Sequence, residues 1–199
     1  MEAINRSRQK IADNIRKATM ADGLNCGLPQ LSLINTKNHT KEDNYDRFSE
    51  SLKIAGAEVV MLKHSELDDY INKKFLGAID FRSMSVWDSY KRIQPVELAA
   101  RTECVLLCGK MGVAENGAIW VDDTCFPERL LPFIAGKLIL LVDCNTIVSD
   151  MHAAYASIAS KLEGFGVFIS GPSKTADIEQ SLVYGAHGAI SVDVIILKG

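Results

Sequence analysis

Hydroxyl, charged and imidazole side chains gather between Gly171 and Gly188, where glycines let a backbone approach a ligand closely. The residues of this segment that could bind a ligand or move a proton are Gly171, Ser173, Lys174, Thr175, Asp177, Glu179, His187 and Gly188. Lys174 and the amides of a helix N-terminus would attract a phosphate or carboxylate, whereas Asp177 and Glu179 oppose a strong anion site. If Asp177 and His187 meet, the carboxylate and the imidazole could hold a proton near neutral pH.

The segment does not match the phosphate loop of nucleotide-binding proteins. Gly166 and Gly171 have the spacing of the outer glycines, but Pro172 and Ser173 separate the second glycine from Lys174. The Walker pattern requires an uninterrupted Gly-Lys-Ser/Thr. We therefore reject a nucleotide phosphate loop at this place.

A capped turn between a strand and a helix is the simplest structure for the same segment. Residues 167–170 form a short apolar run that is typical of a buried strand. Thr175 then has the residue type of a helix N-cap, and Ile178, Leu182 and Ala186 recur every fourth residue. The sequence therefore predicts a short helix after Thr175, with Asp177 and Glu179 in its first turn.

Glu115 lies at the lip of a second predicted turn. Asn116 and Gly117 follow it between apolar runs, which is a strong short-range signal for a β-hairpin because both residue types tolerate positive φ. A carboxylate in this position could act as a base or nucleophile if partial burial raised its pKa. We take Gly117 as a candidate binding residue. The candidate catalytic residues are Glu115, Asp177 and His187.

Composition and charge predict a single soluble α/β domain with at most an appended arm. The 199 residues are enough for one well-buried core, and 47% hydrophobic and 24% charged residues are ordinary globular values. A net charge of −3 offers no basic surface for nucleic acid. No apolar run approaches the roughly 20 residues that span a bilayer, and the N-terminus has no apolar leader. We expect a cytoplasmic protein without a membrane span.

The cysteines argue against a metal centre in this chain. The sequence contains five, at positions 26, 104, 108, 125 and 144, with no CxxC pair and no cluster of four. Nor do the histidines pair at the spacing of metal ligands. We therefore expect free thiols, no bound metal and no iron–sulfur cluster.

Helical and strand patterns alternate along the chain. We expect helices over 1–20 and 41–56 and from 149 onward, and strands at 57–62, 78–81, 104–108, 137–142 and 190–197. Such alternation predicts a layered α/β sheet that is at least partly parallel. We divide the chain into an N-terminal helix and linker, 1–40, and an α/β domain, 41–199. The apolar stripe of the N-terminal helix would cover either the domain or a partner subunit, which leaves a homo-oligomer open.

Three spaced segments in the second half of the chain follow the order found in one known family. They are Ala114–Gly117, Leu131-Pro132 with the apolar run 138–142, and the stretch GPSKTADIEQSLVYGAHG that ends at Gly188. Together they resemble the LUD-domain family of the lactate-utilisation protein C type, over roughly Cys104 to Leu197. Two departures occur: Asn116 replaces a small hydroxyl residue, and Ala189 stands where the family usually has proline.

The resemblance implies a NagB/RpiA/CoA transferase-like fold and a pocket formed by the candidate residues named above. It also implies a lactate-utilisation component that takes part in oxidising L-lactate to pyruvate beside iron–sulfur partner proteins. The clusters would belong to those partners, while this chain would bind a small carboxylic acid or assist assembly.

Two alternatives remain open, and with them the question whether the chain is an enzyme. Glu115-Asn-Gly also resembles the segment that carries the nucleophilic glutamate of coenzyme A transferases, which form an acyl-glutamyl anhydride and then a thioester. Alternatively, the chain is a non-catalytic interaction subunit in which Asp177 and His187 only hold the turn together.

Overall fold

The computed structural model describes residues 13, 40–82, 102–159, 164–176, 182–185 and 187–198. The chain divides into two compact units, Met1–Asn38 and His39–Gly199, and every element discussed below belongs to the second unit. The helix and linker predicted over 1–40 lie outside the described residues, apart from Asp13, which is helical, and Thr40.

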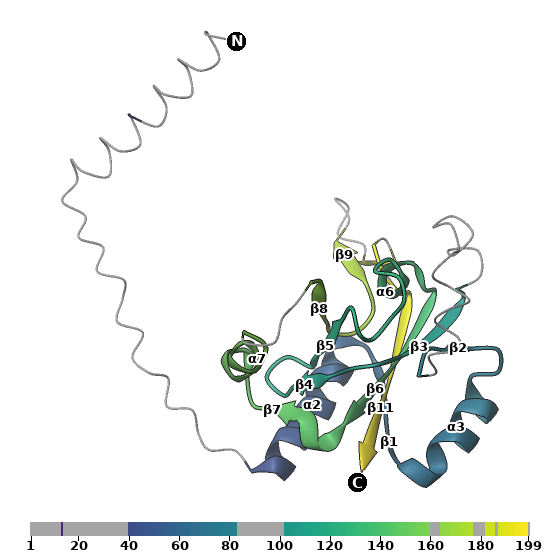
Figure 1. The fold of residues 1–199 in the computed structure, drawn as a ribbon, viewed down its shortest axis with the longest axis horizontal. Coiled ribbons are helices and arrows are strands. Elements are labelled where there is room, and N and C mark those ends of the chain that lie inside the picture. The colour runs from purple at the N-terminus through teal and green to yellow at the C-terminus, as the bar shows by residue number, and fades with distance from the viewer. Residues whose placement is uncertain are drawn as a thin grey trace. The chain divides into compact units, whose positions relative to one another are not determined.

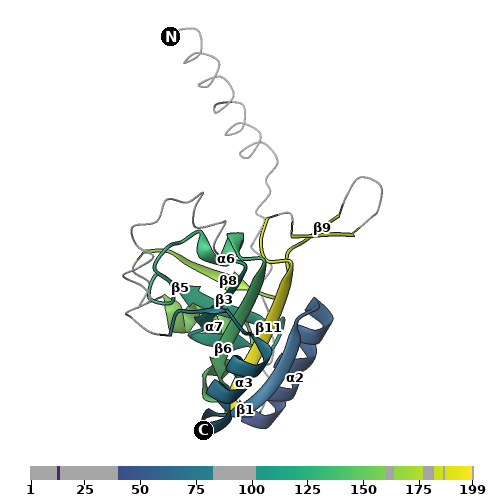
Figure 2. The same cartoon turned by 90° about the vertical axis from the view of Figure 1, so that its right-hand side faces the viewer.

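Five parallel strands form a central sheet in the order β1-β11-β6-β3-β2 (Figures 1 and 2). These strands are β1 (Glu58–Lys63), β2 (Ile79–Asp80), β3 (Cys104–Cys108), β6 (Lys137–Asp143) and β11 (Ser191–Lys198). β6 lies in the middle and buries all residues from Leu138 to Val142, as a continuous apolar run predicts for a strand covered on both faces. The predicted α/β class with a parallel sheet is confirmed.

A smaller sheet has the order β7-β4-β5-β8. Its strands are β4 (Met111–Val113), β5 (Ala118–Asp122), β7 (Ile147–Val148) and β8 (Gly166–Ile169). β4 and β5 are antiparallel and joined by the turn at residues 114–117, so the predicted hairpin is confirmed. Gly117 has φ 69°, and Asn116 Oδ1 accepts a hydrogen bond from Ala118 N at 3.0 Å. Asn116 and Gly117 thus stabilise the hairpin turn that their residue types favour.

Side-chain caps mark the starts of two of the four described α-helices. The four helices are α2 (Lys41–Ala55), α3 (Leu67–Lys74), α6 (Leu131–Ile134) and α7 (Met151–Ile158). Thr40 and Asp43 form a reciprocal capping box at the start of α2, and Gly56 ends it with φ 90°, as predicted. Asp150 caps α7, since its Oδ1 accepts from Ala153 N at 2.9 Å. The end predicted for α2 is therefore confirmed, whereas α7 begins at Met151 rather than at Ser149.

Alternating side chains of the central strands build two cores on opposite faces of the sheet. Ile139 and Leu141 of β6 pack with Ile71 of α3 on one face. Leu138 and Leu140 pack on the other face with α2 and the inner side of the small sheet. A third cluster joins the outer side of the small sheet to α7. Figure 1 shows the resulting order of layers, with α3 and α7 on opposite sides of the two sheets.

The helix predicted after Thr175 is wrong, because this segment forms a pair of strands. They are β9 (Lys174–Ala176) and β10 (Leu182–Tyr184), paired antiparallel with Thr175 opposite Val183. Threonine, valine and tyrosine favour strands, and this preference outweighs the fourfold apolar spacing that suggested a helix. Thr175 is therefore not a helix N-cap. Asp177 and Glu179 lie outside the described residues.

Four of the cysteines are described, and all four are free thiols: Cys104, Cys108, Cys125 and Cys144. Burial raises the pKa of Cys108, and it raises the pKa of Cys125 to about 11. These two thiols are therefore protonated and weakly nucleophilic at neutral pH. Within the described ranges, no three His, Cys, Asp or Glu residues lie close enough to share a metal ion. No helix in the same ranges has the length and apolar character required to cross a membrane.

Candidate functional site

The turn at Gly171 is fixed against the C-terminal end of α2. Gly171 has φ 70°, and a Cβ at this position would lie 2.6 Å from the carbonyl oxygen of Ala55. The ammonium group of Lys174 donates to the same carbonyl oxygen. Close approach of two backbones thus explains Gly171, and Lys174 caps the last turn of α2.

Ser173 joins this turn to the segment that carries His187. Its amide donates to the carbonyl oxygen of Ala189 at 2.9 Å, and its carbonyl oxygen accepts from the Gly185 amide at 3.0 Å. Its hydroxyl oxygen accepts from the His187 amide at 3.3 Å. Gly188 packs beside it, since a Cβ there would lie 3.2 Å from the Ser173 Cβ. The structure therefore brings Ser173, His187 and Gly188 together across fourteen positions of sequence.

A cavity of about 290 Å³ lies beside these residues, and we call it the serine cavity. Leu138 and Val192, each the second residue of its strand, contribute to its apolar lining, so the cavity lies at the amino ends of β6 and β11. Ser173, Lys174 and His187 supply polar groups. Among the described lining residues, Lys174 and His187 are the ionisable side chains, and none is a carboxylate. This lining favours an anion over a cation.

Glu115 does not line the serine cavity. Its side chain is exposed, and its Oε2 accepts a hydrogen bond from the Met151 amide, the first residue of α7, at 3.0 Å. A carboxylate at a helix N-terminus is stabilised by the helix dipole. Glu115 therefore caps α7, and its side chain is exposed rather than partly buried. The coenzyme A transferase hypothesis stays a prediction.

The turn that holds Glu115 nevertheless contacts the Gly171 segment and α2. Ser170 Oγ donates to the Asn116 carbonyl oxygen at 2.7 Å, and Ser51 Oγ donates to the Ala114 carbonyl oxygen at 2.9 Å. A Cβ on Gly117 would lie 2.8 Å from the backbone nitrogen of Leu52. Packing against α2 is thus sufficient to explain Gly117.

Three candidate residues have no described place in the serine cavity. Thr175 lies within β9, and the structure describes only its backbone. Asp177 and Glu179 lie outside the described residues, and so does the hypothetical contact between Asp177 and His187. The serine cavity is therefore formed by Gly171, Ser173, Lys174, His187 and Gly188 from the predicted set.

A larger cavity of about 680 Å³ lies at the carboxyl ends of β3 and β6, and we call it the edge cavity. Lys110 follows β3, and Asn145 and Thr146 follow β6 in a 3₁₀ turn. Trp120 and Asp122 of β5 also belong to the lining. Sequence reasoning missed this site. The available signal was the position of polar residues directly after buried strands, because carboxyl ends of neighbouring parallel strands meet at one edge.

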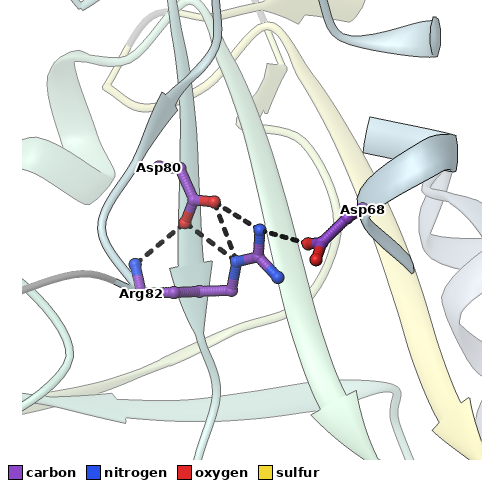
Figure 3. A network of polar contacts seen from close by, with 3 residues as sticks. All are labelled: Asp68, Asp80 and Arg82. Atoms are coloured by element: carbon purple, nitrogen blue, oxygen red, sulfur yellow. Dashed lines mark hydrogen bonds and ion pairs between the residues drawn. The ribbon is translucent and has the colours of Figure 1, made fainter. Parts of the chain in front are cut away.

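Arg82 follows β2 at the same edge but is held by two aspartates (Figure 3). Its Nε and Nη2 donate to Asp80 at 2.6–3.0 Å, and Nη2 lies 2.9 Å from Asp68 Oδ1. The hydrogen bonds with Asp80 are the main reason that the pKa of Arg82 is raised. This network ties β2 to α3, and both aspartates neutralise the guanidinium.

Asp193 forms a second charged cluster, at the amino ends of the strands. Its side chain is nearly inaccessible, with Oδ1 3.0 Å from Lys74 Nζ and Oδ2 2.8 Å from Lys137 Nζ. Partial burial alone would lower the pKa of Lys74, but hydrogen bonds with Glu58 and Asp193 outweigh this effect and raise it. Because every charge has a partner, we assign the cluster to stability rather than to chemistry.

Comparison with known proteins identifies relatives over most of the chain. The family model described as "LUD domain" matches residues 6–197. The Lactate utilization protein C of Anoxybacillus flavithermus is 27% identical over 143 residues, which cover 71% of this chain and 64% of that protein. The protein of the same name from Halalkalibacterium halodurans is 25% identical over 177 residues, 82% of this chain and 75% of that protein.

The match with other relatives is shorter. The Lactate utilization protein C of Geobacillus thermodenitrificans is 28% identical over 121 residues, 58% of this chain and 50% of that protein. The chain thus spans between half and two thirds of the length of the first relatives. A crystal structure of a DUF162 family protein from Deinococcus radiodurans matches with a TM-score of 0.63 and 17% identity, over 80% of this chain and 99% of that one. At this identity the match supports the fold alone.

Proposed function

The chain belongs to the LUD-domain family, and we propose its function from that membership. Its relatives bear the name Lactate utilization protein C. We infer that the chain is a component of lactate utilisation and takes part in the oxidation of L-lactate to pyruvate. Iron–sulfur partner proteins would accept the electrons, and this chain would bind the small acid in the serine cavity.

The lining of the serine cavity is the observation that carries this proposal. Its described ionisable side chains are Lys174 and His187, and the hydroxyl oxygen of Ser173, next to Lys174 in sequence, accepts a hydrogen bond from the His187 amide. Cations and hydroxyl donors recognise a carboxylate through charge-assisted hydrogen bonds. Because Lys174 is engaged with the end of α2, His187 is the exposed group best able to meet a ligand.

Calorimetric titration with pyruvate and L-lactate tests the binding step. His187→Gln should weaken binding of the acid by roughly tenfold or more, because a hydrogen bond to a charged group contributes about 1.5–3 kcal/mol. The matched control is His152→Gln, which changes an exposed histidine on α7 outside the serine cavity. Binding of neither acid, or equal affinities for the two variants, would contradict the proposed site.

Growth and co-purification test the wider role. Deletion of the gene should abolish growth on L-lactate, and the wild-type gene should restore it. A tagged chain should retain proteins with the absorption of iron–sulfur clusters. Unchanged growth of the deletion strain together with no retained iron–sulfur protein would overturn the proposal, whatever the binding result.

A further inference from the structure

We propose that the edge cavity binds an aromatic organic anion of about nucleotide size, as a second ligand distinct from the small acid. The cavity is defined by its position at the carboxyl ends of the two central strands β3 and β6. In open α/β sheets, ligands bind in the crevice outside the carboxyl ends of parallel strands. The serine cavity lies at the opposite ends of the same sheet, so the two sites are separate.

The edge cavity is larger than a three-carbon acid would fill. It measures about 680 Å³, more than twice the 290 Å³ of the serine cavity. Pockets of roughly 300–1,000 Å³ bury ligands of drug or cofactor size. A ligand with the volume of lactate would leave most of the lining in contact with water.

One wall of the edge cavity is apolar and includes an aromatic ring. Met111, Trp120 and Ile158 belong to the cluster between the small sheet and α7, and each retains 7–8% of its surface exposed. The Trp120 ring is braced by Phe168, with ring centroids 4.8 Å apart. These edges form a rigid apolar surface against which a planar ring can pack.

The lining also includes polar groups with unused hydrogen-bonding capacity. Lys110 is exposed and makes no ion pair with any described residue, while its backbone is fixed by a 2.9 Å hydrogen bond from its amide to the Trp120 carbonyl oxygen. Asn145 donates to Asp143 at 3.0 Å, and its amide oxygen has no described donor. Lys110 suits a phosphate or carboxylate, and Asn145 suits the polar edge of a heteroaromatic ring. Asp122 is the carboxylate among the described lining residues, and its Oδ1 is engaged by the Thr124 amide at 2.9 Å and the Thr124 hydroxyl at 2.6 Å.

Titration of the full chain with adenosine monophosphate, flavin mononucleotide, adenosine and inorganic phosphate tests this proposal. We expect a nucleotide to bind more tightly than adenosine or phosphate alone, since both the ring and the anion contribute. Lys110→Gln should weaken nucleotide binding by roughly tenfold or more. Ser157→Trp, which places a large ring at an exposed lining position, should block it. Lys53→Gln, an exposed lysine on α2, is the matched control and should have no effect.

Three results would overturn the proposal. These are no binding of either nucleotide at about 5 mM, binding that Lys110→Gln and Ser157→Trp leave unchanged, and phosphate binding as tight as nucleotide binding. Pyruvate binding separates this inference from the proposed function, because Lys110→Gln should not affect it. Failure at one cavity therefore leaves the other to be judged by its own variants.

Discussion

The cluster around Asp193 allows a quantitative test of how the central sheet tolerates a buried charge. The Asp193 side chain is 4% exposed and has one lysine on each carboxylate oxygen, at 3.0 and 2.8 Å. Lys74→Met or Lys137→Met leaves the other cation in place, so each should lower the free energy of unfolding by only about 1 kcal/mol, since the lysine side chains are 38% and 34% exposed. The double variant leaves a buried carboxylate without a cation and should cost about 3–5 kcal/mol.

Urea unfolding followed by circular dichroism gives the four free energies of this double-mutant cycle. The expected coupling between the two lysines is at least about 1 kcal/mol, whereas independent sites add within about 0.3–0.5 kcal/mol. Lys73→Met, in the same helix, controls for loss of an exposed lysine. Adding Asp193→Leu to the double variant should restore stability, because the unpaired charge is removed. An additive cycle, or no recovery with leucine, would refute the view that Asp193 is desolvated.

Three further predictions test roles assigned to single residues. Glu115→Ala should lower stability by about 1 kcal/mol in urea unfolding, through loss of the α7 cap; a modified Glu115 after acyl-coenzyme A and borohydride treatment would instead favour the transferase hypothesis. Gly171→Ala should lower the free energy of unfolding by about 2 kcal/mol or more, because its Cβ would meet α2. Gly77→Ala should lower it only by the strain of positive φ, about 1–2 kcal/mol, because no atom lies within 4 Å of a Cβ there. Equal losses for the two variants in thermal unfolding would contradict the close approach of Gly171 to α2. Hydrogen bonds from the Ala153 amide and the Ser149 side chain lower the pKa of Asp150 in the folded state. The stability that Asp150 contributes is therefore present above its unfolded pKa of about 3.9 and is lost as pH falls through its folded pKa. Asp150→Ala should make the free energy of unfolding less dependent on pH in that acid range, and an unchanged pH dependence would count against the cap.

Elements with a strong local signal were predicted correctly. The apolar run of β6, the glycine that ends α2 and the hairpin at Asn116 all depend on residues close in sequence. The segment after Lys174 was predicted wrongly. Its apolar spacing suggested a helix and its residue types favoured a strand, and the pairing of β9 with β10 decided the outcome. Short apolar periodicities are ambiguous in this way.

The candidate site was predictable only where its members belong to one short segment of the chain. Ser173 and His187 belong to one predicted segment, and the structure places them in contact. The role of Glu115 depends on Met151, 36 positions away, and no local pattern indicates that contact. Lys110 and Asn145 share the edge cavity only because β3 and β6 are neighbours, which requires the strand order of the whole sheet.

The pairing of β1 with β11 has a consequence for synthesis of the protein. β1 lies at one edge of the central sheet, and its neighbour there is the last described strand of the chain. During translation β1 therefore has no partner strand until residue 198 has left the ribosome. Such non-local pairing slows folding and leaves apolar surface exposed in the meantime. Nascent chains of this protein should therefore expose β1 to chaperones until β11 joins it to β6.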